Sequence, residues 1–582
     1  MKKTSYLLLT GLLALTLISC GEENGTETST TYTPRNAEIA TPTVWKSTSV
    51  ILIDCIVAVN STLTIEPGCT VTFTNNGYLK VGEANNGAII ANGTADKPIR
   101  FTTALYTQAG SGTFTAQSGS WYGLYFGERN MVNTTSLRHC IFEGAGKNNT
   151  PCIELYKTTL DLESSIIRDC AGIGVKAGLL SSFKKFSYNE LSRCGGFLLS
   201  GIPEALVELD KTNTLAPNNN KNIALMGGSI EFDCTLTKQT IPYTVLGNIY
   251  VENAVLTIEK GITLNFTNET SLNIGKEQRA ALVAIGTAAE PIRLTSAASS
   301  PQAGDWQGLL FYEKNSSTQT HLKYVTIDYA GKAIGTAEGA IYTYSPIFVE
   351  NSIIKNSQTY GIWCANGVTL TNFTNDTIQG CGKCPISINV NQAHTIDLNT
   401  IFTNNEYNYI QLKGSNLTSN ATWRKLSLPY VLMDGLIIGY ENALVKLTLS
   451  PGCTLEFPTG KSLTVGINGT LSAIGTLQDS ITFTSASDTP QAGDWTGITF
   501  ENGCSLGNNL CYCNVENAGD FLEFNIGINS SNVAITHSTI QNSLHHGIYI
   551  YYHEPANTPI LRDNAFNGNL GDNIHYEIQP EQ

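Results

Sequence analysis

The sequence predicts an all-β solenoid in which one large unit of about 190 residues is written three times. The first observation is a repeated phrase: PQAGDWQG at 301–308 returns as PQAGDWTG at 490–497, with a looser copy, SGSWYG, at 118–123. The second is composition, because only 14% of the residues are charged and Gly, Asn, Thr and Ser supply the polarity, which favours turn-rich β structure. The third is the alternation of apolar and polar residues in short runs, which is typical of half-buried strands.

Each unit opens with two alternating runs joined by a turn. The copies are TLTIEPGCTVTF at 62–73, VLTIEKGITLNF at 255–266 and KLTLSPGCTLEF at 446–457. A glycine in each turn supplies the permissive backbone that a tight turn needs. The next position is Cys69, Ile262 or Cys453, and a position shared by Cys and Ile indicates packing in the core.

The second half of each unit alternates short strands with Asn- and Gly-rich turns, as in NSIIKNSQTYGIWC at 351–364 and HSTIQNSLHHGIYI at 537–550. The strand–turn cycles predict coils of about 20 to 27 residues, within the range of solenoid repeats. We therefore divide the chain into a signal peptide at 1–20, a flexible tether at 21–43 and three units at 44–240, 241–427 and 428–582.

The shared phrase of the three units, hxIxPGxxVxF followed by LxVxGxLxAxGTxxxPIxFTS, WxGIxF and SxLxxxxIxxAG, resembles right-handed parallel β-helix proteins of bacterial envelopes. These belong to the pectin-lyase-like superfamily, and many are lipoproteins of unassigned function. The resemblance covers about residues 44 to 578 and implies a right-handed parallel β-helix solenoid. Such a coil buries its apolar face only by stacking on its neighbours at about 4.8 Å.

The first twenty residues have the pattern of a bacterial export signal. Lys2 and Lys3 precede an apolar stretch at 7–18, which ends in Leu17-Ile18-Ser19-Cys20. This ending resembles the lipobox of bacterial lipoproteins, which implies lipidation of Cys20 and a partner in the outer-membrane lipid. The acidic start at 21–23 is compatible with display on the cell surface, so we expect an envelope lipoprotein.

The formal net charge of −14, with no cluster of Lys or Arg, excludes nucleic acid as an expected partner. The fourteen cysteines after Cys20 have no disulfide-framework pattern, and several lie in apolar strand runs. Cys381 and Cys384 have redox or zinc spacing, so a local disulfide or metal role stands as an alternative to packing. No cofactor and no metal site are assigned.

Two repeated features suggest chemistry at first sight. Asp305 and Asp494 recur beside the tryptophans, where paired catalytic acids are one interpretation and turn-capping is the other, which we favour. Trp121, Trp306 and Trp495 are predicted to cover a corner of the coil, and the alternative is a row of sugar-stacking platforms.

The candidate ligand-binding residues are aromatic and imidazole side chains, most of them close to the C-terminus. In GIYIYYH, Ile548 and Ile550 point inward by strand alternation and the intervening tyrosines point outward. We place Trp363 at the equivalent outward position of the second unit and Gly174 at that of the first. Such a surface suits sugar stacking or a weak metal site, and the alternative is an ordinary outward row of good β-formers. The full set is Trp363, His545, His546, Tyr549, Tyr551 and His553.

The resulting hypothesis is a surface-anchored lipoprotein that binds glycans or cell-surface partners along a regular face. The alternatives are a polysaccharide lyase or glycoside hydrolase of the same superfamily, and a passive spacer. The polygalacturonase-like and epimerase-like motifs of the superfamily are not matched, since His546-Gly547 has no paired aspartates and His553-Glu554-Pro555 is not the epimerase motif. No catalytic residue is assigned.

Overall fold

The computed structural model describes residues 31–32, 38–108, 114–206, 209–216, 218, 220–336, 338–439, 443–551 and 558–577. They form almost entirely short strands, which group into two compact units. The first unit contains Met1–Ile249 and Thr257–Asn265, and the second contains Tyr250–Leu256 and Phe266–Gln582. The helical segments are α1 (Pro203–Leu206), η1 (Lys147–Asn149) and η2 (Val390–Thr395).

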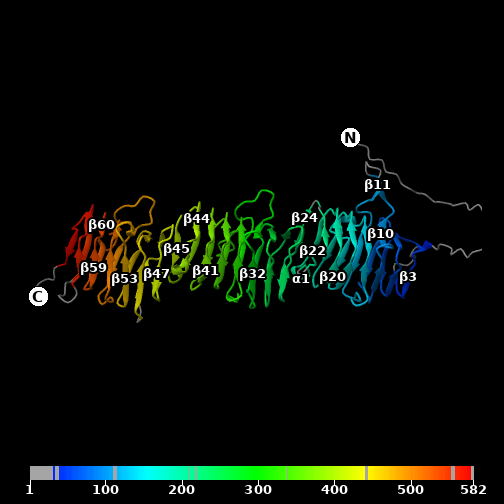
Figure 1. Cartoon of the computed structure of the whole chain (residues 1–582), viewed down its shortest axis with the longest axis horizontal. Helices are drawn as coiled ribbons and strands as arrows, with labels where there is room; N and C mark the ends of the chain where they lie inside the picture. Colours follow the sequence, from blue (N-terminus) through cyan, green and yellow to red (C-terminus); the bar gives the residue numbers. More distant parts are fainter. Residues whose placement is uncertain are drawn as a thin grey trace, which may run out of the picture. The chain divides into compact units, whose positions relative to one another are not determined.

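Most strands of the first unit stack in three parallel sheets. Figure 1 shows the stacked strands from blue to cyan. One sheet contains β4 (Val50–Ile53), β7 (Thr70–Phe73), β10 (Ile99–Thr103), β15 (Cys140–Glu143), β18 (Ile166–Arg168), β21 (Glu190–Ser192) and β23 (Thr214–Leu215). The second contains β2 (Glu38–Ile39), β5 (Ile56–Val59), β8 (Tyr78–Val81), β13 (Gly123–Phe126), β16 (Ile153–Leu155), β19 (Val175–Ala177), β22 (Phe197–Gly201), β24 (Asn220–Leu225) and β27 (Tyr243–Val245). The third contains β3 (Thr43–Trp45), β6 (Thr62–Ile65), β9 (Ala88–Asn92), β14 (Ser136–Arg138), β17 (Thr159–Glu163) and β20 (Ser182–Ser187).

The longest stack of the second unit, which we call the central sheet, carries one candidate surface. It contains β31 (Ser271–Ile274), β34 (Gly308–Phe311), β37 (Ile341–Thr343), β40 (Ile362–Cys364), β43 (Ile386–Asn389), β45 (Ile410–Lys413), β48 (Tyr430–Leu432), β51 (Thr454–Phe457), β54 (Ile481–Ser485), β57 (Cys513–Glu516), β60 (Thr539–Gln541) and β63 (Ala565–Asn567). A shorter stack, the terminal sheet, contains β46 (Asn416–Leu417), β49 (Leu436–Ile438), β52 (Ser462–Val465), β55 (Gly497–Phe500), β58 (Phe524–Asn529), β61 (His546–Tyr551) and β64 (Ile574–Tyr576).

The other stacks of the second unit complete its coils. They contain β32 (Ala281–Ile285), β35 (His321–Lys323), β38 (Ile347–Glu350) and β41 (Leu370–Thr374); β33 (Ile292–Ser296), β36 (Val325–Asp328), β39 (Ile353–Lys355), β42 (Thr377–Gln379) and β44 (Ile401–Thr403); and β47 (Ala421–Trp423), β50 (Val445–Leu449), β53 (Gly469–Ile474), β56 (Asn508–Cys511), β59 (Val533–Thr536) and β62 (Ile560–Arg562).

Strands three apart in the chain pair in parallel, which makes each coil a turn of a right-handed parallel β-helix and confirms the predicted fold class. Regular coils have the predicted length, since Ile153 pairs with Val175 and Ile362 pairs with Ile386. Inserted loops lengthen others, because Ile99 pairs with Cys140 across the antiparallel hairpin of β11 (Tyr106–Gln108) and β12 (Phe114–Ala116).

The core consists of aliphatic ladders that run along the coils. The residues of one ladder are aligned by strand pairing and fully buried: Val57, Leu79, Leu124, Ile153, Val175, Leu199 and Ile223. Burial of one such side chain contributes about 1.5–3 kcal/mol. The strand alternation seen in the sequence therefore determines which side chains face the core.

A second ladder of polar side chains holds one corner of the coils. The backbone N–H of Cys140 donates to Oγ of Ser165, that of Ser165 to Oδ1 of Asn189, and that of Asn189 to Oδ1 of Asn213, each at 3.0 Å. The residues immediately before the first three have left-handed backbone, with φ between 47° and 56°. The sharp corner removes these N–H groups from strand pairing, and the side chains of the next coil satisfy them.

Candidate functional site: outward aromatic surfaces and a histidine cluster

The three repeated tryptophans are core residues. Trp121, Trp306 and Trp495 each have 0% exposed area. Each ring stacks almost parallel on a phenylalanine, with centroids 3.9–4.4 Å apart: Phe73, Phe266 and Phe457. Each indole N–H donates to a backbone carbonyl of the following coil: that of Glu143, Asp328 or Glu516. The structural interpretation is confirmed, and a row of sugar-stacking platforms is excluded because no ring face reaches solvent.

Asp305 and Asp494 cap turns, as predicted. Oδ2 of Asp305 accepts from the backbone N–H of Gln302 at 3.0 Å and from the hydroxyl of Ser296. Oδ2 of Asp494 accepts from the N–H of Gln491 at 2.9 Å and from Ser485 Oγ at 2.7 Å. These contacts are local and identical in kind in both copies, so they account for the recurrence of the acid without catalysis.

The fourteen cysteines among the described residues are free thiols, most of them buried. Cys381 and Cys384 form no disulfide, and burial raises the pKa of each thiol to about 12. Such thiols stay protonated at neutral pH and behave as small apolar side chains.

Trp363 lies on β40 of the central sheet, facing outward between two buried neighbours. Its ring stacks on Tyr342 of β37 with centroids 4.5 Å apart and planes 10° apart. The ammonium of Lys413, on β45, lies 3.4 Å from the centroid of the Trp363 ring. A cation on one face and an aromatic ring on the other leave the edge of Trp363 as its accessible part.

Lys413 is the least expected member of this surface. Its Nζ donates to the carbonyl of Cys364 at 2.6 Å, and no carboxylate pairs with it among the described residues. Burial lowers the pKa of Lys413 to about 8, because desolvation disfavours the ammonium. No local sequence pattern predicts this contact, because Lys413 and Trp363 come together only through the stacking of coils.

Polar groups continue the surface on neighbouring coils. The hydroxyls of Tyr342 and Tyr344 lie 2.8 Å apart. Trp363 pairs in register with Ser387, and Ser387 with Gln411. Gln411 donates to Ser387 Oγ at 3.3 Å. Along these four coils, two aromatic rings are therefore followed by a hydroxyl and an amide.

The position equivalent to Trp363 in the first unit is Lys176, which corrects the assignment to Gly174. Gly174 precedes β19, whereas Lys176 pairs with Glu154 as Trp363 pairs with Tyr342. Lys176 Nζ lies 2.9 Å from Glu154 Oε1. Gly174 aligns with Gly361 in the second unit. The outward position predicted from the sequence therefore lay two residues before the correct one, Lys176.

Glu456 faces outward farther along the central sheet, in register with Val431 on one side and Thr484 on the other. Burial raises the pKa of Glu456 to about 7, and the negative charge of Asp488 adds to the effect. The carboxyl is half-buried and therefore still reachable. Sequence reasoning missed it because a single glutamate on an alternating strand carries no motif.

The predicted C-terminal residues lie on the terminal sheet, away from Trp363 on the central sheet. Ile548 and Ile550 are buried, and Tyr549 and Tyr551 face outward, as predicted. His546, at the start of β61, is half-buried. The rings of Tyr549 and Tyr551 have centroids 4.4 Å apart. His545 lies just before β61 and is half-buried, and His553 lies outside the described residues.

Two further residues, Asp572 and His575, join this group. His575 pairs with Tyr549, and its ring stacks on that of His546 at 4.3 Å. Nδ1 of His575 lies 2.8 Å from Oδ2 of Asp572. His546, Asp572 and His575 each offer a ligand atom within 4.8 Å of the others. The available sequence signal is the spacing of three residues between Asp572 and His575, which is too common to indicate a site by itself.

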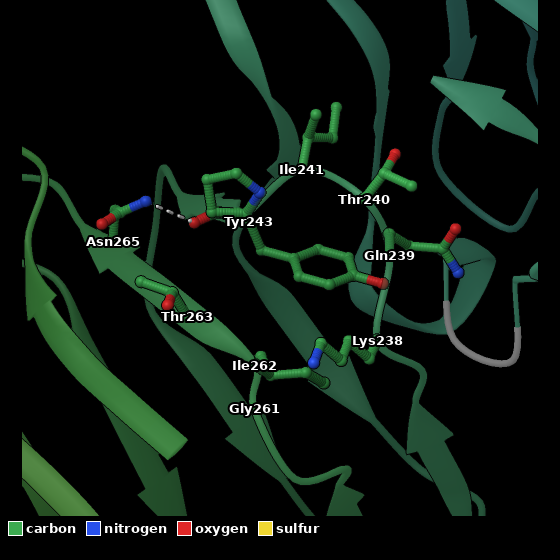
Figure 2. Close-up of a pocket in the computed structure, with 10 residues that line it drawn as sticks. Lys238, Gln239, Thr240, Ile241, Tyr243, Gly261, Ile262, Thr263 and Asn265 are labelled. Carbon is green, nitrogen blue, oxygen red and sulfur yellow. Dashed lines mark hydrogen bonds between the residues drawn. The ribbon is translucent and has the colours of Figure 1, made fainter. Parts of the chain in front are cut away.

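Cavities are also present among the described residues. One of about 320 Å³ lies in the first unit, where Figure 2 shows the Tyr243 ring across the middle and Asn265 donating to the Tyr243 carbonyl at 3.2 Å. The Tyr243 hydroxyl donates to the carbonyl of Thr237, six residues back. The hydroxyl of Tyr430 donates in the same way to the carbonyl of Arg424, which indicates a repeated corner of the coil.

Two further cavities lie on outward sheet faces. One of about 530 Å³ is lined by Phe183 and Lys185 of β20 and by Glu204 of α1. Glu204 accepts from the backbone N–H of Glu231 at 2.7 Å. One of about 280 Å³ is lined by Arg293, Tyr324 and Lys355. Lys355 pairs with Asp328 at 3.0 Å, so its charged group already has a partner.

Cys20 and the whole segment before residue 31 lie outside the described residues. Among the residues that the structure describes, none of the helices has the length and hydrophobicity that a membrane span requires.

Comparison with known proteins gives a match to one segment of the chain. Residues 228–342 match the model described as a pectate-lyase like beta helix domain. No curated protein and no solved structure matches the chain significantly.

Proposed function

We propose that this right-handed parallel β-helix protein, with its pectate-lyase-like segment, binds glycans on the outward face of the central sheet. We call this face the Trp363 surface. Its half-buried members are Tyr344, Trp363, Gln411 and Lys413, and the buried side chains of Tyr342 and Ser387 support them. The observation that carries the proposal is the ammonium of Lys413, which lies on an aromatic ring without a carboxylate partner among the described residues.

The chemistry of this surface favours an acidic glycan. A partly desolvated cation is stabilised when an anion approaches it, and a carboxylate-bearing sugar supplies that anion together with hydroxyls. The hydroxyl of Tyr344 and the amide of Gln411, which are half-buried, can exchange hydrogen bonds with those sugar hydroxyls, whereas Tyr342 and Ser387 are buried beneath the surface. Because outward positions repeat at about 4.8 Å along the coils, a polymer can lie along the sheet with repeated contacts.

The aromatic rings of this surface offer a ligand their edges and hydroxyl groups rather than open ring faces. Tyr342 and Lys413 cover the two faces of Trp363, so a sugar stacks on that ring only if Lys413 moves. Lys413 therefore recognises the acidic group of the glycan, and Trp363 holds the Lys413 ammonium in place.

The test is glycan-array binding of the purified protein with neutral and acidic oligosaccharides, followed by titration of the hits. Lys413→Met keeps the length of the side chain and removes the charge, and we expect it to weaken binding of acidic glycans by about tenfold or more. Lys425→Met is the matched control, because Lys425 is exposed and already pairs with Asp479. Unchanged binding by Lys413→Met would contradict the proposal, and a blank array would favour a passive spacer.

A second candidate function is hydrolysis or lysis of the bound polysaccharide. The observation that favours it is Glu456, whose pKa of about 7 keeps part of its carboxyl protonated near neutrality on the same outward face. Assays for new reducing ends and for unsaturated products on the array hits test it. Loss of product with Glu456→Gln, at unchanged binding, would support catalysis, and no product from the parent protein would exclude it for those substrates.

Display on the outer membrane through lipidated Cys20 is also a proposal, supported by the sequence pattern that ends at Cys20. A surface-anchored position would place the Trp363 surface where polysaccharides or cell-surface partners are met.

A further inference from the structure

The last described coil of the second unit brings two histidines and an aspartate together. β61 and β64 pair in parallel, with Tyr549 opposite His575. His546 begins β61, and His575 lies in the middle of β64. Asp572 lies three residues before His575, in the turn that leads into β64.

The separations suit one shared metal ion. A tetrahedral site with bonds of about 2.1 Å places neighbouring ligand atoms about 3.4 Å apart. Oδ2 of Asp572 lies 2.8 Å from Nδ1 of His575 and 3.7 Å from Nδ1 of His546, which brackets that value. One ligand atom from each of the three residues lies within 4.8 Å of the others.

Contacts around the cluster hold the ligands in place. The imidazole rings of His546 and His575 stack at 4.3 Å, and Tyr549 packs against His575 at 4.9 Å. The backbone N–H of Gly547 donates to the carbonyl of Asp572 at 2.9 Å. The turn is therefore tied to the start of β61, and little rearrangement is needed to bring the three ligands together.

Two hydrogen bonds compete with the metal. Nδ1 of His575 lies 2.8 Å from Oδ2 of Asp572, and an ion bound between these atoms replaces this contact. The backbone N–H of Asp572 donates to Nδ1 of His546 at 3.0 Å, so a metal bound at Nδ1 replaces this bond. The exchange is favourable, because a single neutral hydrogen bond is weak beside a metal–nitrogen bond. The same bond leaves the Nδ1 lone pair deprotonated, which is the state that a metal requires.

We propose that His546, Asp572 and His575 bind one divalent transition-metal ion, with Zn²⁺ as the best match. Two imidazole nitrogens and one carboxylate oxygen are typical Zn²⁺ ligands, whereas Ca²⁺ and Mg²⁺ prefer oxygen alone. His546 and His575 are half-buried and Asp572 is exposed, so an ion reaches the site from solvent. The ion would join the last described coil to the coil before it, independently of glycan binding.

The test is titration of the metal-stripped full chain with Zn²⁺ by isothermal calorimetry, with Ca²⁺ as the control ion. We expect one equivalent of Zn²⁺ to bind through these residues and the melting temperature to rise with Zn²⁺ concentration. Asp572→Asn keeps the size of an exposed side chain and should weaken this binding by at least tenfold, as should His575→Gln.

His537→Gln is the matched control, because His537 Nε2 lies 3.6 Å from Asp563 Oδ2 in a similar pair that lacks a second histidine among the described residues. It should leave the affinity and the stoichiometry unchanged. Binding of Co²⁺ adds a visible spectrum that reports tetrahedral coordination by nitrogen and oxygen. The proposal is overturned if the parent protein binds no Zn²⁺, or if folded Asp572→Asn binds it with the same affinity and stoichiometry.

Discussion

At the scale of single residues, Asp376 occupies a corner position that asparagine holds elsewhere. Oδ1 of Asp376 accepts from the N–H of Ser352 at 2.7 Å, as Oδ1 of Asn189 does from Ser165 and Oδ1 of Asn564 from Ser538. The asparagines also donate Nδ2 to a strand carbonyl, at 2.9 Å for Asn189 and 2.8 Å for Asn564. Oδ2 of Asp376 is buried and has no hydrogen-bond partner among the residues that the structure describes.

Burial raises the pKa of Asp376 to about 7, and the negative charges of Asp397 and Glu350 add to the effect. The unfolded chain loses this proton near pH 3.9, whereas the folded protein keeps it until about pH 7. The free energy of unfolding therefore falls as the pH rises between these values and stays lowered above pH 7.

Asp376→Asn should remove this loss, because the amide restores the donor and carries no charge. We expect a gain in unfolding free energy of about 2–4 kcal/mol at pH 8 and little change at pH 4. Denaturant unfolding of both proteins at the two pH values measures it. Asp434→Asn is the control, because Asp434 is exposed and also accepts a backbone N–H, that of Gly414. An equal gain from Asp376→Asn at both pH values would contradict the explanation.

For single residues, the sequence predicts which side chains face the core but not which side chains of different coils meet. The inward direction of Ile548 and Ile550 follows from alternation alone, so the sequence predicts it correctly. The meeting of Lys413 with Trp363 depends on how many residues each intervening coil contains. Local patterns do not determine that number, so this contact could not be predicted.

At the scale of elements, the Trp–Phe stacks connect the inserted loops to the coils. The Trp306 ring lies 4.1 Å from that of Phe266, and its N–H donates at 2.8 Å to the carbonyl of Asp328. The stack therefore closes the corner at which an inserted loop returns to β34. The repeated phrase predicted this role, because three copies of a local structure recur more readily than three active sites.

Trp306→Ala should destabilise the second unit by about 3 kcal/mol or more, since it leaves a large cavity beside Phe266 and an unsatisfied carbonyl at Asp328. Urea unfolding followed by circular dichroism measures the change. Trp363→Ala is the matched control, because Trp363 is only half-buried and should cost less. An equal loss in the two variants would show that burial in the corner is not the source of the stability.

At the scale of the whole molecule, repetition made the architecture predictable and left the site undetermined. Parallel coils require only alternation, turns and a sustained period, and all three are visible in the sequence. The histidine cluster needed the pairing of Tyr549 with His575, and strand alternation alone does not determine which residues pair across a coil. The division into three units at 240 and 427 stays a prediction, as contacts group the chain into two units.

The location of the protein is the prediction that concerns the molecule as a whole. If Cys20 carries lipid, Cys20→Ala should block maturation, since a chain without the thiol has no site for the acyl group. An apolar stretch at 7–18 is too short to anchor the precursor as a stable membrane span. We therefore expect the variant to move into the soluble fraction or to accumulate with its first twenty residues attached. Membrane fractionation and intact-protein mass spectrometry in a bacterial host measure both outcomes, and Cys55→Ala serves as a control because Cys55 lies within the folded chain. A variant that fractionates with the membrane and has the parent's mature mass would show that the protein reaches the envelope by another route.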